Sequence, residues 1–163
     1  MRELLAVTGR WTPDDAGNCR SFPFEVSERA RRLRVVFWYE PLTAERPEER
    51  IQRQRAMALA SRRLGRPVSA ADFPGERLPG NFATLSLEDP LGYRGTRYRL
   101  AGCHRVVLDD VQATPGYELR ALAGGLWRAT VTVWAMASPQ CRYELAAWAE
   151  ESAGGEVGGW SGS

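Results

Sequence analysis

The chain has 163 residues, a length that fits one globular domain with a core of its own. Its composition, 44% hydrophobic and 26% charged residues, is that of ordinary folded proteins and excludes wholesale disorder. The formal net charge is only +2, which argues against a polyanionic partner, and all 22 basic residues are arginine.

The sequence also carries signals about the compartment. The N-terminal residues show no secretory signal, and no apolar run approaches the ~18 residues of a membrane span. Cys19, Cys103 and Cys141 are too few and too widely spaced for a disulfide scaffold or a zinc knuckle. We therefore expect reduced thiols in a cytoplasmic protein without a membrane partner, and whether any two cysteines pair stays open.

Alternation of apolar and polar residues with a period of two is the dominant pattern along the chain. In chain order, it predicts strands at residues 3–10, 20–26, 31–40, 81–88, 103–109, 126–136 and 141–149. About seven short strands separated by Gly, Pro and Asp are typical of an all-β fold. We predict an antiparallel two-sheet β-sandwich of jelly-roll or immunoglobulin-like type.

One segment departs from this pattern and predicts a helix over residues 47–64, inserted between two strands. Pro47 and Glu49 suit the first turn, and Arg62 and Arg63 suit the last turn. Gly65 follows at the position where helices often end. The apolar residues form a weak stripe, so the helix should pack by one side.

The C-terminal residues have a different composition. Residues 151–163 are rich in Gly and Ser and cannot supply a core, which predicts a flexible tail or linker. The folded domain is therefore expected to comprise residues 1–150.

Catalytic and metal-binding patterns are weak. His104 is the single histidine, and dispersed cysteines cannot complete a zinc site with it. The acid pairs Asp14–Asp15 and Asp109–Asp110 could supply oxygen ligands to calcium, but their spacing is not that of a calcium loop. We predict no catalytic residue, metal site or cofactor.

Three tryptophans are more informative. Trp38, Trp134 and Trp148 each lie on the strand face opposite the aliphatic residues, so they would gather on one outer surface if their strands shared a sheet. Such a surface would be a ligand platform or a protein interface. The favoured alternative is that the helix 47–64 or a partner buries them.

The stretch LEDPLGYRGTRYRL, residues 87–100, carries the other candidate site. Asp89 to Gly92 predict a turn after a core strand. The turn does not require the side chains of Tyr93, Arg94, Arg97 and Tyr98, which are therefore candidates for contact with a ligand or partner. For Arg94 we favour hydrogen bonds within its own loop, since most side-chain hydrogen bonds go to backbone or water.

A nucleic-acid interface is a further alternative. The stretch from Arg29 to Arg66 contains eleven arginines and only four glutamates, and the arginines could neutralise phosphates. The helix bases alternate with glutamates, however, which is typical of a solvated helix face. We therefore favour the solvated face over a nucleic-acid interface.

The run from Asn81 to Glu150 resembles the N-terminal β-sandwich module that precedes the catalytic domain of bacterial PHP-type (CehA/McbA-like) metallohydrolases. The matching residues are Leu85, Leu87, Asp89, Pro90, Gly92, Arg94, Gly95, Ala113 to Tyr117, Leu122, Gly125, Trp127, Cys141 and Tyr143. The resemblance extends over residues 9–149, and the layout is also similar to pre-peptidase C-terminal sandwiches. The helix 47–64 looks like an insertion relative to the family.

The resemblance implies a non-catalytic accessory module that docks a PHP-type hydrolase, forms a homodimer or presents a ligand. Gly159 and Trp160 resemble the start of the family's first metal-binding motif, but its histidines are absent from this sequence, so no catalytic residue is carried over. The alternative is a module that binds carbohydrate or another polymer through the tryptophans or the 93–98 loop.

Overall fold

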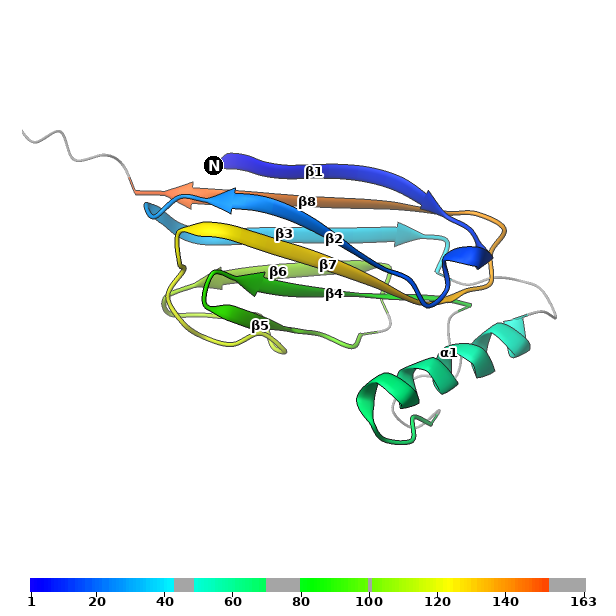
Figure 1. The fold of residues 1–163 in the computed structure, drawn as a ribbon. Coiled ribbons are helices and arrows are strands. Elements are labelled where there is room, and N and C mark those ends of the chain that lie inside the picture. Colours follow the sequence, from blue (N-terminus) through cyan, green and yellow to red (C-terminus); the bar gives the residue numbers. More distant parts are fainter. Residues whose placement is uncertain (43–48, 70–79, 100, 153–163) are drawn as a thin grey trace, which may run out of the picture.

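The computed structural model describes residues 1–42, 49–69, 80–99 and 101–152. Eight strands in these ranges form two four-stranded antiparallel sheets that face each other, and a helix lies beside one end (Figure 1). The strands are β1 (Arg2–Trp11), β2 (Cys19–Val26), β3 (Ala30–Glu40), β4 (Asn81–Asp89), β5 (Gly92–Thr96), β6 (Cys103–Asp109), β7 (Gly125–Met136) and β8 (Cys141–Glu151).

The pairing of the strands defines a jelly roll. Sheet A has the order β1-β8-β3-β6 and sheet B the order β2-β7-β4-β5. The chain pairs β4 with β5, β3 with β6, β2 with β7 and β1 with β8, so it is one long antiparallel hairpin rolled into two layers. The predicted all-β sandwich is confirmed, but it has eight strands and not seven.

The strand that the sequence analysis missed is β5. It has five residues, two of which are glycines, so it shows no alternation of apolar and polar side chains. The predicted turn is present at its start, where Gly92 has a φ of +122° and the backbone N–H of Leu91 donates to Asp89 at 2.8 Å.

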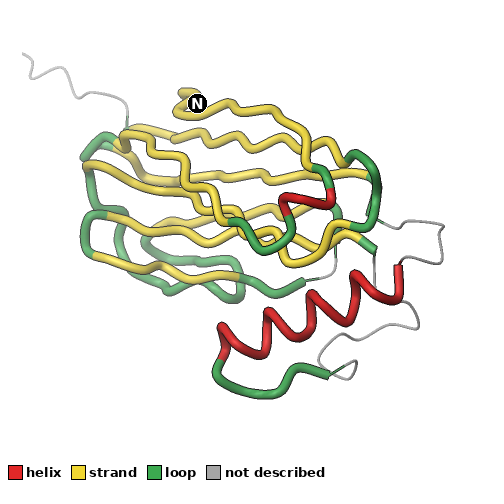
Figure 2. Tube along the Cα trace, turned by 45° about the vertical axis from the view of Figure 1, so that its right-hand side comes forward, coloured by secondary structure: helices red, strands yellow, loops and turns green. Residues whose placement is uncertain are grey.

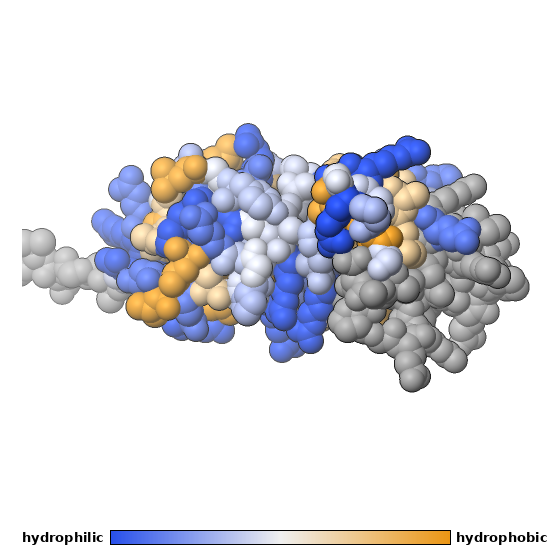
Figure 3. Space-filling model, turned by 90° about the horizontal axis from the view of Figure 1, so that it is seen from below, coloured by the Kyte–Doolittle hydropathy of each residue, from blue (hydrophilic) through white to orange (hydrophobic). Residues whose placement is uncertain are grey.

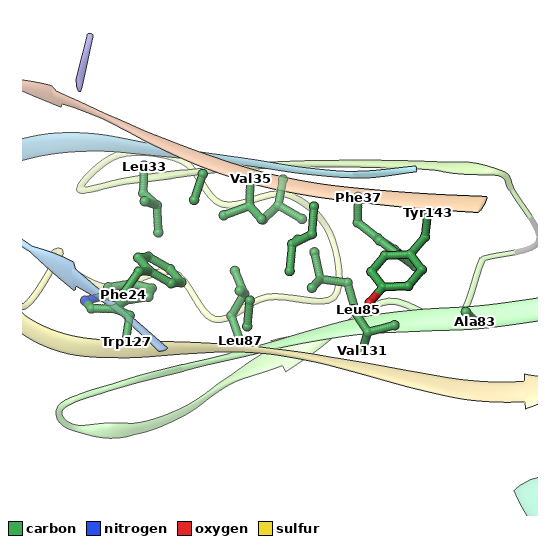
Figure 4. Close-up of a cluster of buried hydrophobic side chains, with 14 of the residues drawn as sticks. Phe24, Leu33, Val35, Phe37, Ala83, Leu85, Leu87, Trp127, Val131 and Tyr143 are labelled. Carbon is green, nitrogen blue, oxygen red and sulfur yellow. The ribbon is translucent and has the colours of Figure 1, made fainter. Parts of the chain in front are cut away.

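The core lies between the two sheets. Leu33, Val35 and Phe37 of β3 are all 0% exposed and point toward sheet B, as their alternation predicts (Figure 4). Leu85 and Leu87 of β4 and Trp127 of β7 meet them from the opposite layer. Interdigitation of the two inner faces is what holds such sandwiches together.

Helix α1 (Glu49–Leu64) confirms the predicted insertion, and Pro47 lies outside the described residues. The helix is followed by Gly65, whose φ of +64° is the left-handed conformation that glycine adopts readily. Ala60 packs with Phe82, Trp134 and Ala135 in a second, smaller cluster. The helix therefore covers only one end of the outer face of sheet B (Figure 2).

The C-terminal boundary differs slightly from the prediction. Strand β8 runs to Glu151, and residues 153–163, which make up most of the predicted tail, lie outside the described residues. In the described part of the chain, no helix is long and apolar enough to cross a membrane.

The loop of residues 110–124 connects β6 to β7, and on the way it passes β5 at the edge of the sandwich. The backbone N–H of Thr114 donates to Val107 at 3.0 Å, and that of Glu118 donates to Arg94 at 2.6 Å. The hydroxyl of Tyr117 donates to the carbonyl of Leu85 at 2.8 Å. These bonds fasten the loop to both edge strands.

Candidate functional site

Arg94, one of the predicted ligand contacts, points into the protein. Glu88 pairs with Tyr93 and Leu87 with Gly95, so Arg94 is the extra residue of a β-bulge. The whole residue is 1% exposed, and its guanidinium donates to Asp89 at 3.2 Å and to the carbonyls of Ala121 and Arg120 at 3.2 and 3.0 Å. Arg94 therefore makes the internal hydrogen bonds that the sequence analysis favoured and is not open to a ligand.

The three tryptophans do not gather on one surface, because their strands do not share a sheet, which was the condition for that arrangement. Trp38 and Trp148 lie on the outer face of sheet A, in β3 and β8, whereas Trp134 belongs to β7 of sheet B. The reason is the jelly-roll order, which sends β7 and β8 to opposite layers. Helix α1 buries Trp134 to 4% exposure, and Trp38 and Trp148 stay half-buried.

Two other predicted residues do approach Trp134. The ring centroids of Tyr98 and Trp134 are 5.8 Å apart, and Tyr93 lines the same groove on the outer face of sheet B. The groove has a volume of about 130 Å³ and lies between α1, β4, β5 and β7. Its lining comprises Arg63, Leu64, Thr84, Ser86, Tyr93, Thr96, Tyr98, Thr132 and Trp134.

The aromatic residues give the groove a partly apolar wall. Tyr93 and Tyr98 are 56% and 46% exposed, so their rings are open to a ligand. Burial raises the pKa of both phenols, which keeps them as neutral O–H groups at pH 7. The indole N–H of Trp134 is already used, since it donates to Thr84 at 2.9 Å.

Hydroxyl groups line the floor of the groove. Thr96 donates to the carbonyl of Leu85 at 2.8 Å, and Ser86 donates to that of Thr130 at 3.3 Å. A hydroxyl that donates in this way keeps lone pairs that accept hydrogen bonds. The Tyr93 phenol bonds to the Thr96 hydroxyl, so the groove offers acceptors on its floor and the Tyr98 phenol as a donor on its wall.

Arg63 fixes the end of α1 against the groove. Its guanidinium donates to the sulfur of Cys19 at 2.7 Å and to the carbonyl of Gly17 at 3.2 Å. It also lies over the Trp134 ring, 5.6 Å from the centroid. Although burial opposes the shift, the hydrogen bond from Arg63 lowers the pKa of the exposed Cys19 thiol.

One acid of each pair considered for calcium has other partners. Asp15 accepts the backbone N–H of Thr12 at 2.8 Å. Asp109 accepts from Arg32 at 2.9 Å and from the backbone N–H of Gln112 at 2.7 Å. Burial would raise the pKa of Asp109, but the hydrogen bonds from the Val111 backbone, Arg32 and Gln112 lower it to about 2. Within the described ranges, no group of three His, Cys, Asp or Glu side chains is arranged to hold a metal ion.

The arginines between residues 29 and 66 whose side chains the structure describes do not form one surface. Arg32 and Arg34 lie on β3 of sheet A and pair with Asp109 and Glu150 at 2.9 and 2.7 Å, whereas Arg63 packs on sheet B. The cysteines are also apart: Cys19 is exposed, Cys103 half-buried and Cys141 buried, and all three are free.

The structure thus brings Tyr93, Tyr98 and Trp134 together in one groove. Trp38 and Trp148 lie on the other sheet. Arg97 lines a separate cavity on the edge of the sandwich. Sequence reasoning missed Arg63 and the hydroxyl residues of the groove. The alternation in β4 and β7 could have put Thr84 and Thr132 on the outer face, but nothing local placed the helix beside them.

The fold and the groove define a jelly-roll β-sandwich with an aromatic and hydroxyl-lined surface. No protein-family model matches the chain, and no curated protein matches it in sequence.

Proposed function

We propose that this protein is a non-catalytic binding module whose groove takes a hydroxylated ring, such as one unit of a carbohydrate chain. The observation that carries the proposal is the convergence of Tyr93, Tyr98 and Trp134 on a floor of hydroxyl groups. Aromatic rings provide apolar contact with a polar edge, which suits a ligand that has an apolar face and a rim of hydroxyls.

The volume of the groove agrees with a polymeric ligand of which only one part enters the groove. The groove of about 130 Å³ is smaller than the about 300–1,000 Å³ of typical small-molecule pockets. It therefore fits part of a polymer, whose remaining units would lie on the outer face of sheet B. There the hydroxyls of Ser21 and Thr130 are exposed or half-buried and bond to each other at 2.7 Å.

Binding can be tested by titrating the protein with soluble oligosaccharides and following its amide signals by NMR. We expect shifts confined to the groove and a loss of affinity of about tenfold in Tyr98→Ala, the cost of one aromatic contact. Leu126→Ala is the matched control, because Leu126 is 44% exposed at the far end of the same sheet face. Oligosaccharides that leave the groove signals unchanged would disprove the proposal.

A second function, an interaction module that dimerises or docks a PHP-type hydrolase, is favoured by a different surface. Trp38, Val36, Ala146 and Trp148 are half-buried neighbours on the outer face of sheet A. Of the described elements, none packs over this face. Arg34 and Glu150, paired at 2.7 Å, lie at its border, as in interfaces with an apolar centre and a polar rim.

The oligomeric state separates the two functions. If sheet A forms a homodimer, light scattering will give twice the monomer mass, and Trp148→Ser will restore the monomer. A monomeric wild-type protein that fails to bind a purified PHP-type hydrolase excludes this second function and leaves the groove proposal intact.

A further inference from the structure

A second cavity lies on the edge of the sandwich where β5 and β6 run, the face seen in Figure 3. It has a volume of about 260 Å³. The residues that matter for its chemistry are Arg97, Arg99, His104, Thr114 and Tyr117. Hydrophilic side chains, drawn in blue and pale blue, cover much of this face (Figure 3).

The arginines of this cavity lack the partners that other arginines have. Among the described residues, no carboxylate forms an ion pair with Arg97, Arg99 or Arg105, whereas Arg120 pairs with Asp89 at 2.8 Å. Arg97 and Arg99, whose charges act on His104, therefore bring two positive charges to the cavity without a negative charge to balance them. Arg105 follows His104 in β6 and pairs with Val36, so its side chain points to the outer face of sheet A. Guanidinium groups donate in a fork that matches the oxygens of phosphate and carboxylate.

His104 supplies an independent observation. It is 5% exposed, and its Nε2 has no hydrogen-bond partner in the described part of the chain. The imidazole also bonds to the backbone of Ala101, and it packs near the rings of Phe37 and Tyr39 at 5.5 and 6.3 Å. A buried polar atom without a partner is costly, and a ligand that bonds to it removes that cost.

The hydroxyls of the cavity already have partners. Tyr117 donates to the carbonyl of Leu85 at 2.8 Å, and Thr114 accepts the backbone N–H of Val107 at 2.9 Å. They hold the 110–124 loop in place. The groups left for a ligand are therefore the guanidiniums of Arg97 and Arg99 and Nε2 of His104.

We propose that this cavity binds a small organic phosphate, with its phosphate oxygens on Arg97 and Arg99 and a hydrogen bond to His104. Its volume of about 260 Å³ is just below the about 300 Å³ at which typical small-molecule pockets begin, so it suits a small organic molecule better than a bare ion. The site does not depend on the carbohydrate groove, because neither cavity shares a lining residue with the other.

His104 makes the proposal directly measurable, because it is the chain's single histidine and gives one set of imidazole NMR signals. Burial, together with the charges of Arg99 and Arg97, lowers its pKa to about 4, although the hydrogen bond to Ala101 opposes this shift. A bound phosphate favours the imidazolium, so the pKa should rise and binding should strengthen as the pH falls from 7 to 5.

The other groups that face His104 do not change charge in this pH range. Arg97 and Arg99 stay protonated. Tyr39 from β3 and Tyr117 from the loop stay neutral, since burial raises the pKa of each phenol. The phosphate itself takes up a proton near pH 6, so the pKa of His104 is measured separately with phosphate and with sulfate, which stays a dianion.

The experiment titrates the full chain with glucose 6-phosphate, inorganic phosphate and sulfate while recording the His104 signals. We expect saturable shifts, a raised pKa of His104 and tighter binding of the sugar phosphate than of inorganic phosphate. Equal or weaker binding of the sugar phosphate would overturn the assignment of an organic ligand in favour of a free oxyanion. Unchanged His104 signals at about 10 mM of each probe, ten times a Kd of about 1 mM, would overturn the site itself.

Variants test the assignment of the arginines. Arg97→Gln and Arg99→Gln should each weaken phosphate binding roughly tenfold or more, as expected for a lost charge-assisted hydrogen bond. Arg128→Gln is the control, since Arg128 is an exposed arginine on the outer face of β7. An equal loss of affinity in the control would mean that the effect is net charge and would overturn the site. Tyr98→Ala should impair the groove without abolishing phosphate binding, which separates the two proposals.

Discussion

At the scale of single residues, the central feature is the buried network around Asp89. Arg94 and Arg120 both donate to its carboxylate, at 3.2 and 2.8 Å, and the side chains of Asp89 and Arg94 are both 0% exposed. Arg94 also lies 5.5 Å from the centroid of the Trp127 ring. Removal of one member of such a network leaves charged and polar groups buried without partners.

We therefore expect Arg94→Ala to lower the free energy of unfolding by about 3 kcal/mol, the low end for a broken buried pair, because Arg120 still compensates Asp89. Urea denaturation followed by circular dichroism measures the change. Arg128→Ala, at an exposed site, should change stability by less than about 0.5 kcal/mol. If the two variants were equally stable, Arg94 would not have the internal role described above.

At the scale of elements, helix α1 depends on tertiary contacts more than on its own pattern. Its apolar stripe is weak, and its described contacts with the sandwich are formed by the C-terminal half, where Ala60 is 4% exposed. Most helical stability in proteins comes from packing of one face, so this small contact determines whether the helix stays in place. It also determines the shape of the groove, because Arg63 and Leu64 form one wall.

Ala60→Glu should detach α1, because it places a charge against Phe82 and Trp134. Trypsin should then cleave after Arg62 and Arg63 faster than in the wild-type protein, while the sandwich still unfolds cooperatively. Ala58→Glu is the matched control, since Ala58 is exposed on the same helix. Equal cleavage rates in the two variants would contradict this account of how the helix is held.

At the scale of the whole molecule, the jelly roll makes the two sheets one cooperative unit. Successive strands alternate between sheets along much of the chain, as β1 and β2 do, and β7 and β8. Neither sheet can therefore form from one continuous stretch of chain. The core side chains that join the layers should stabilise both sheets together.

Leu85→Ala should destabilise the protein by about 2–5 kcal/mol, because Leu85 is fully buried between the sheets. Tryptophan fluorescence and far-UV circular dichroism should still report one coincident unfolding transition. Leu126→Ala, at an exposed position, should leave the midpoint nearly unchanged. Two separated transitions would show that the sheets unfold independently.

The sequence by itself determined the local features. Period-two alternation predicted seven of the eight strands and the buried face of β3. Pro, Arg and Gly signals predicted a helix over residues 47–64, and the structure has it at Glu49–Leu64. The turn before β5 also followed from residue types, whereas the internal hydrogen bonds of Arg94 were favoured over contact with a ligand because most side-chain hydrogen bonds go to backbone or water. These features are predictable because they depend on neighbours in the chain, through pleat geometry, helix termini and turn conformation.

Only the tertiary structure decided which strands share a sheet, and this determined both candidate sites. It separated Trp134 from Trp38 and Trp148, placed Arg63 beside Tyr98, and brought Arg97 and Arg99 near His104 across the edge of the sandwich. Pairing of strands far apart in the sequence depends on the packing of the whole core. The residues that meet through this pairing therefore carry no local sequence signal of their contact.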